Sequence, residues 1–146
     1  AKYFKRIPKI IVVEPDRADC VLQSIKSCKL KKIKIKKESI MGGMSCNEMS
    51  YIPWQILKKA SNHCVSVSDR NVAKTVALLK DKKLSKNSII GGECSAPGII
   101  SLVSVCNESK TKKLIELNEK SNVLIIGCEG NADVKLYKQL LSKGRK

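Results

Sequence analysis

The chain has 146 residues, of which 42% are hydrophobic, 29% charged and 3% aromatic, and its formal net charge is +16. The length suits one domain with a substantial core, and the hydrophobic fraction argues against disorder in spite of the charge. The sequence has no apolar run of 18 residues, so it predicts no membrane-spanning helix, and its basic N-terminus lacks the apolar region of a secretion signal.

Seven cysteines occur without CxxC spacing, and His63 is the only histidine. This pattern lacks the signature of a metal site such as zinc, and we predict none. Because the sequence shows no export signal, we expect a cytoplasmic, reducing environment with free thiols. Apart from Cys128, the cysteines are expected to be small buried hydrophobes.

The N-terminal part predicts a strand, a helix and a loop. Residues 7–15 form a continuous β-branched run that ends at Pro15, which is typical of a strand buried on both faces in a parallel sheet. Asp16 offers the N-cap of a helix over about residues 17–29. Residues 30–37 are lysine-rich and predict a loop with at most a short edge strand.

The middle of the chain alternates between helical and extended patterns. Residues 51–60 predict a helix with Pro53 in its first turn, and residues 63–68 predict a short strand. Asp69 offers the N-cap of a helix that continues to about residue 82. Residues 88–93 predict a connector or short strand that reaches a polar site.

The C-terminal part predicts three helices and one strand. Residues 95–106 are small or apolar nearly all round and predict a buried helix, whereas residues 110–118 predict a more exposed one. Residues 121–130 predict a second buried strand that runs into a glycine turn. Residues 133–143 predict a final amphipathic helix with Val134, Tyr137, Leu140 and Leu141 pointing inward. The order of elements predicts an α/β fold with a mostly parallel sheet flanked by helices.

Three glycine-bearing segments could form a ligand site, because ligands of open α/β sheets bind beyond the carboxyl ends of the strands. They are residues 41–44, 91–95 and 127–130. None contains a complete phosphate-binding loop, and the alternative interpretation is a set of tight turns. Glu93 precedes a predicted helix, where a carboxylate can also act simply as a cap. No pair of nucleophile and base can be assigned.

Five blocks of sequence resemble the diaminopropionate ammonia-lyase family, in the same order and over nearly the whole chain. These blocks are residues 8–20, 39–48 (SIMGGMSCNE), 54–57 (WQIL), 92–98 (GECSAPG) and 125–133 (IIGCEGNAD). The family consists of pyridoxal-phosphate enzymes of fold type II, the tryptophan-synthase β-like group, which cleave 2,3-diaminopropionate to pyruvate and two ammonia.

The resemblance implies that residues 1–146 are the C-terminal part of the large cofactor-binding domain. The Schiff-base lysine, and with it every catalytic residue, is expected upstream, so the chain alone is expected to be inactive. Ala1, in place of Met, agrees with a fragment or a processed chain. For the intact enzyme the resemblance implies a pyridoxal phosphate cofactor, an amino-acid substrate, a role in amino-acid catabolism and a homodimer.

The resemblance also implies three cofactor-binding residues. Cys128 aligns with the Ser or Thr that meets the pyridine nitrogen, and a thiol is a weaker hydrogen-bond partner there. Gly43 aligns with a glycine whose backbone passes beside the cofactor ring, and Glu93 aligns with a glutamate near that ring. The substitutions at Asn47, Gly127, Cys128 and Ala132 leave the exact substrate and the activity open.

Two alternative functions follow from the same sequence. The substitutions are compatible with a non-catalytic domain that keeps the pyridoxal-phosphate fold without the reaction. The net charge of +16 would suit a nucleic-acid-binding domain, but the lysines are spread along the chain and the few aromatic residues give no stacking platform. We therefore expect neither a nucleic-acid nor a membrane partner.

Overall fold

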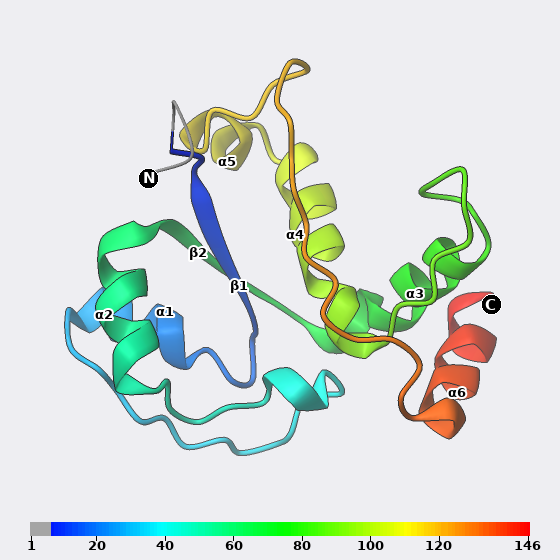
Figure 1. Ribbon diagram of the computed structural model, residues 1–146, viewed down its shortest axis with the longest axis horizontal. Helices are drawn as coiled ribbons and strands as arrows, with labels where there is room; N and C mark the ends of the chain where they lie inside the picture. The colour runs from blue at the N-terminus through cyan, green and yellow to red at the C-terminus, as the bar shows by residue number, and fades with distance from the viewer. Residues whose placement is uncertain (1–6) are drawn as a thin grey trace.

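A two-stranded parallel sheet organises the N-terminal half of the computed structural model, which describes residues 7–146 (Figure 1). Strand β1 (Ile10–Pro15) pairs with β2 (Ser61–Val67), and the register aligns Val12 with Cys64 and Val13 with Val65. Both strands were predicted, although β1 begins at Ile10 rather than at residue 7. The parallel arrangement requires a crossover, and the chain between the two strands supplies it.

One face of this sheet is covered by α1 (Cys20–Ser27) and α2 (Tyr51–Ala60). Val12 and Cys64 point to this side, where they contact a small core that contains the buried Trp54. Helix α2 has the predicted bounds, since Ser50 precedes it in an extended conformation and Pro53 fits its first turn.

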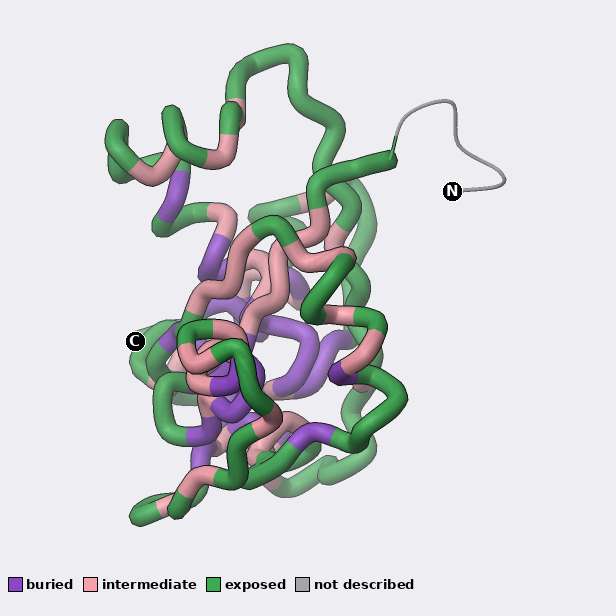
Figure 2. The backbone as a smooth tube through the Cα atoms, turned by 90° about the vertical axis from the view of Figure 1, so that its left-hand side faces the viewer, coloured by how far each residue is buried: buried purple, intermediate pink, exposed green. Residues whose placement is uncertain are grey.

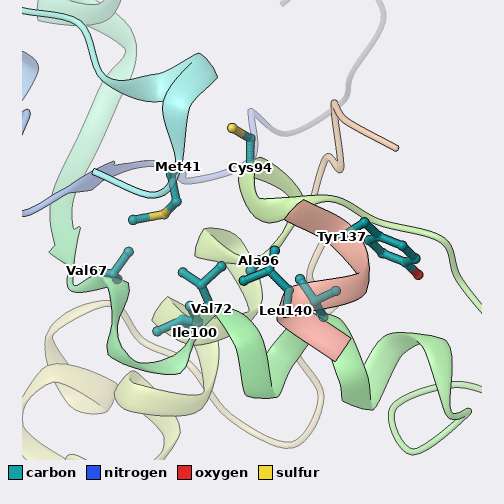
Figure 3. Close-up of a cluster of buried hydrophobic side chains, with 9 residues drawn as sticks. Met41, Val67, Val72, Cys94, Ala96, Ile100, Tyr137 and Leu140 are labelled. Carbon is teal, nitrogen blue, oxygen red and sulfur yellow. The ribbon is translucent and has the colours of Figure 1, made fainter. Parts of the chain in front are cut away.

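The opposite face carries the main core, because neighbouring strand residues point to opposite sides of a sheet. Val13 and Val65 face this core, and α4 (Pro97–Cys106) packs on both strands. Helix α3 (Val72–Lys80) continues the layer, and α6 (Val134–Gly144) packs against α3. Helices thus flank both faces of a parallel sheet, which confirms the predicted α/β class. The buried residues of this core are Met41, Val67, Val72, Val76, Cys94, Ala96, Ile100, Tyr137 and Leu140 (Figure 3).

The remaining elements are short. Helix α5 (Ser109–Leu114) has no buried residue, and three 3-10 turns occupy Gly42–Met44 (η1), Asp69–Asn71 (η2) and Glu93–Ser95 (η3). Buried backbone gathers in the middle of the molecule, whereas long exposed stretches run around it (Figure 2). Within residues 7–146 no helix combines the length and the apolar character needed to cross a bilayer.

The N-terminus of α1 differs from the prediction, because Asp16 does not cap it. The helix begins at Cys20, and the buried carboxylate of Glu14 accepts hydrogen bonds from the backbone N–H of Val21 at 2.9 Å and of Leu22 at 2.8 Å. Burial raises the pKa of Glu14, and the two amides oppose that shift by favouring the charged form. A residue at the end of β1 therefore takes the place of the local cap.

Asp69 is not a helix cap either. Its carboxylate accepts hydrogen bonds from the Ser39 hydroxyl at 2.6 Å and from the Ile40 backbone N–H at 3.2 Å, and it forms an ion pair with Arg17 at 2.5 Å. The side chain of Ser68 instead accepts from the Arg70 N–H at the start of η2. Asp69 thus joins the end of β2 to the segment that leads into η1.

The predicted buried strand over residues 121–130 is wrong for this chain. The segment is extended but belongs to no sheet, and Val123, Leu124 and Ile126 are exposed. Residues 88–93, for which a connector or a short strand was predicted, form a connector. Helix α4 is buried on only part of its surface, since Val103 is exposed. The apolar pattern was recognised correctly, but within residues 7–146 the neighbouring strands that would bury these side chains are not present.

The terminal helix was predicted more closely. Asp133 caps α6 by accepting a hydrogen bond from the Leu136 N–H at 2.8 Å, and Tyr137 and Leu140 are buried as expected. Val134, which was expected to point inward, is exposed.

All seven cysteines are free thiols, but most do not behave as buried hydrophobes. Cys20 and Cys94 are buried and Cys64 is half-buried. The prediction of burial is wrong for the exposed residues Cys28, Cys46 and Cys106, and Cys128 is exposed as well. The apolar character of a cysteine alone therefore did not predict its burial in this chain.

Candidate functional site

The three glycine-bearing segments come together near the end of β2. The backbone N–H of Gly92 donates to the Glu129 carbonyl at 3.0 Å, which joins segment 91–95 to segment 127–130. Gly43 of η1 lies beside Cys94, so that a methyl group added at Gly43 would lie 3.3 Å from the Cys94 Sγ. The three segments that were selected from the sequence as possible ligand-binding segments therefore lie together in the fold.

Gly92 marks the closest approach within this site. A Cβ atom added there would lie 2.2 Å from the Gly130 carbonyl oxygen and 3.0 Å from the side chain of Glu129. The φ angle of Gly92 is −75°, so the requirement for glycine comes from lack of space and not from an unusual backbone conformation.

Glu129 holds the site together, and the sequence analysis did not single it out. Its Oε2 accepts a hydrogen bond from the Cys94 N–H at 2.9 Å. Its backbone carbonyl accepts from the Ser95 hydroxyl at 2.6 Å, and its N–H donates to the same hydroxyl oxygen at 3.3 Å. The only available signal was its place between Cys128 and Gly130, because its partners lie 34 or 35 residues away in sequence.

The three residues predicted to bind a cofactor lie on these segments. Cys128 is exposed, and its Sγ lies 4.0 Å from the Cys94 carbonyl oxygen. Gly43 is exposed on η1. Glu93 is half-buried at the start of η3, and within residues 7–146 its carboxylate accepts no hydrogen bond from another residue. Burial, followed by the negative charges of Glu129 and Asp133, raises the pKa of Glu93.

Glu93, Cys94 and Glu129 also place potential metal-ligand atoms within 4.8 Å of one another. The chemistry of this set favours a structural role. Burial raises the pKa of the Cys94 thiol to about 12, so a metal would have to displace its proton against this shift. The Glu129 carboxylate is already engaged by the Cys94 N–H.

The buried thiols give the chain a predictable response to alkali. Burial raises the pKa of Cys94 to about 12 and the pKa of Cys64 to about 11, from an ordinary value of 9.0. Above pH 9 the unfolded chain loses these protons while the folded chain keeps them, so stability that is complete below pH 9 declines as the pH rises through 11 to 12. Urea unfolding at several pH values should show this decline, and Cys94→Ala should flatten it.

Exposed Cys106 provides the matched control for that measurement. Cys106→Ala should leave the slope of unfolding free energy against pH unchanged, because this thiol is in water in both states. Equal slopes for the parent chain and both variants would contradict the prediction, since lysine deprotonation would then account for the whole decline.

Comparison with solved structures identifies the class of fold. Maize serine racemase superimposes with a TM-score of 0.71 at 18% identity, over 92% of this chain and 39% of that one. The L-serine ammonia-lyase of Rhizomucor miehei gives 0.70 at 15% identity, over 94% of this chain and 40% of that one. The chain therefore has the α/β fold of the fold type II pyridoxal-phosphate enzymes. No family model matches it.

Within this class the chain is similar to diaminopropionate ammonia-lyase, as its motifs predicted. It is 31% identical to the Escherichia coli K12 protein over 138 residues, which cover 92% of this chain and 35% of that protein. Identity to the Salmonella typhimurium protein is 28% over 150 residues, or 99% of this chain and 37% of that one. The Escherichia coli enzyme solved in complex with D-serine superimposes with a TM-score of 0.79 at 30% identity, over 94% of this chain and 34% of that one. The chain thus spans about a third of the length of these relatives.

Proposed function

We propose that this chain is the C-terminal part of the large domain of a pyridoxal-phosphate-dependent ammonia-lyase. The intact protein would eliminate ammonia from 2,3-diaminopropionate and yield pyruvate and ammonia. The observation that carries the proposal is similarity in both sequence and fold to diaminopropionate ammonia-lyase over more than nine tenths of this chain. The related Escherichia coli enzyme has been solved with an aminoacrylate–pyridoxal phosphate reaction intermediate.

The residues of the candidate site fit one wall of such a cofactor pocket. The exposed backbone of Gly43 and Gly127 allows a flat ring to approach closely, and a Cβ added at the neighbouring Gly42 would meet no atom within 4 Å. The exposed Cys128 offers a thiol in place of a carboxylate, and it would contact the pyridine nitrogen without holding it protonated. Pyridoxal phosphate would supply the electron withdrawal that lets the α-proton of an amino acid leave.

The positions of these residues support different roles for this chain and for the rest of the intact enzyme. Glu93 and Cys128 would border and orient the cofactor, while Glu129 keeps their two segments together through the Cys94 N–H. The lysine that holds the cofactor covalently and the groups that move protons would come from the part of the relatives that this chain does not match. The proposal assigns the intact enzyme to the cytoplasm as a homodimer, and treats the lysine-rich loop as solvated surface without a nucleic-acid or membrane partner.

Turnover assays test the proposal directly. The full-length translation product of the gene should release ammonia and pyruvate from 2,3-diaminopropionate, and the 146-residue chain alone should release neither. Borohydride reduction in the presence of pyridoxal phosphate should give a stoichiometric lysine adduct only in the full-length product. A unique adduct with turnover in the 146-residue chain would overturn the assignment as an inactive part. A full-length product without turnover on any β-substituted amino acid would favour a non-catalytic domain that keeps the fold.

A further inference from the structure

Ser95 bonds to both backbone groups of the residue that follows Cys128. Its hydroxyl donates to the Glu129 carbonyl oxygen at 2.6 Å and accepts from the Glu129 N–H at 3.3 Å. That N–H belongs to the planar peptide unit that joins Cys128 to Glu129, so the bond restrains the backbone on the carboxyl side of Cys128. Within residues 7–146, the backbone groups of residues 126–128 form no hydrogen bond. Ser95 therefore supplies the nearest backbone restraint on Cys128.

Ser95 also contacts the residue that precedes Cys128. A Cβ atom added at Gly127 would lie 3.3 Å from the Ser95 Oγ and 3.5 Å from the Ser95 Cβ. The glycines of residues 7–146 all have ordinary φ angles, so any need for glycine at position 127 comes from lack of space. The Ser95 Oγ could move away only by giving up its bonds to Glu129. One side chain thus holds the backbone on both sides of Cys128.

The core of the fold determines the position of Ser95. This residue is 7% exposed, and its N–H donates to the Gly92 carbonyl at 3.1 Å within η3. The next residue, Ala96, is fully buried among the residues of the main core (Figure 3). Helix α4 follows at once and packs on both strands of the sheet. The sheet and the main core therefore set the place of the Ser95 hydroxyl, and through it the place of Cys128.

We propose that Ser95 is a positioning residue for the cofactor, because it sets where the Cys128 thiol meets the pyridine nitrogen. The inference rests on the proposed function, which places the pyridoxal phosphate ring against Cys128. A thiol is a weak hydrogen-bond partner, and such a contact weakens steeply when its geometry changes. Ser95 would act through the backbone of Cys128, since Glu129 already engages its hydroxyl.

Protection of Cys128 from alkylation measures this role in the full-length translation product. Cofactor-free protein is treated with iodoacetamide at increasing concentrations of pyridoxal phosphate, and mass spectrometry follows the peptide that contains Cys128. Ser95→Ala should raise the concentration that gives half-protection about tenfold, because both backbone groups of Glu129 lose the hydroxyl. The absorbance of the bound cofactor should show the same rise. Alkylation of Cys106, which is exposed here, should not respond to pyridoxal phosphate.

Ser24 provides the matched control, because its hydroxyl makes the same kinds of bond in a different core. It is 0% exposed, donates to the Cys20 carbonyl at 2.7 Å and accepts from the Lys31 N–H at 3.0 Å. Ser24→Ala should lower the unfolding midpoint as Ser95→Ala does, and leave the half-protecting concentration unchanged. A tenfold rise in both variants, or in neither, would overturn the positioning role alone. A parent product that pyridoxal phosphate does not protect would overturn the proposed function and this inference together.

Gly127→Ala gives a second variant that keeps the Ser95 hydroxyl. Its methyl group would press on the Ser95 Oγ, so this variant should also raise the half-protecting concentration of pyridoxal phosphate. In a Ser95→Ala background that contact is absent, and Gly127→Ala should cause a smaller rise than it does in the parent. Equal rises in the two backgrounds would show that the two positions act independently, and would overturn the inference that Ser95 holds Cys128 from both sides.

Discussion

Gly92→Ala is expected to open the candidate site and to destabilise the fold by about 1–3 kcal/mol. The new methyl group would lie 2.2 Å from a backbone oxygen, that of Gly130, and cannot be accommodated by turning a flexible side chain. Segments 91–95 and 127–130 would have to separate, which breaks the hydrogen bond from Gly92 to Glu129. Urea unfolding measures the loss of stability, and the rate at which Cys94 reacts with a thiol reagent reports the opening.

Gly42→Ala is the control for this experiment, because a Cβ at Gly42 would meet no atom within 4 Å. This variant should keep the parent's unfolding free energy to within about 0.5 kcal/mol and leave Cys94 as slow to react as before. If Gly92→Ala behaved in the same way as Gly42→Ala, the close contact between the two segments would not exist in solution.

Leu140→Ala is expected to cost about 2–5 kcal/mol of stability, because it leaves a cavity in the main core. Leu140 is 1% exposed and attaches α6 to the layer formed by α3 (Figure 3). Loss of its side chain should loosen α6 as a unit. Thermal or urea unfolding measures the effect.

Leu114→Ala removes the same atoms from a side chain that is 67% exposed on α5. Its expected effect is within about 0.5 kcal/mol, since little apolar surface is buried there. Similar losses for both leucine variants would show that α6 does not pack on α3 as described.

Local sequence signals predicted the elements whose partners are close in sequence. Helix α2 was predicted with the bounds that the structure shows, with Pro53 in its first turn. The terminal helix was predicted to begin at Asp133, whose side chain contacts the N–H of Leu136, three residues on. The predictions for Asp16 and Asp69 failed for the opposite reason. Their expected roles were local, but Glu14 reaches α1 from the end of a strand and Asp69 bonds to Ser39, 30 residues away.

In the candidate site, too, some features have a local sequence signal and others depend on contacts between residues that are distant in sequence. The three glycine-bearing segments that the sequence singled out do lie together, although none of them directly follows a strand within residues 7–146. The role of Glu129 was not predicted, because it depends on a hydrogen bond with Cys94, which is 35 residues away in the sequence. The apolar pattern of residues 121–130 indicated a buried strand, yet burial requires neighbouring strands, and no pattern within these residues could show where those neighbours lie.

Because Asp69 holds Ser39 and Ile40 by hydrogen bonds, the geometry of the site depends little on the length of the loop that precedes these residues. Ser39 and Ile40 are held directly against the end of β2, so the position of Gly43 is set by that anchor and only weakly by the path of residues 29–37. Ile33 is itself held by the hydrogen bond from its N–H to the Asn47 carbonyl at 2.8 Å, so this freedom belongs to the lysine-rich residues 34–37. They can vary in number and composition during evolution at low cost, because each doubling of a flexible loop adds only about 0.6 kcal/mol of closure entropy. Their charge can change in the same way, with Gly43 left in place.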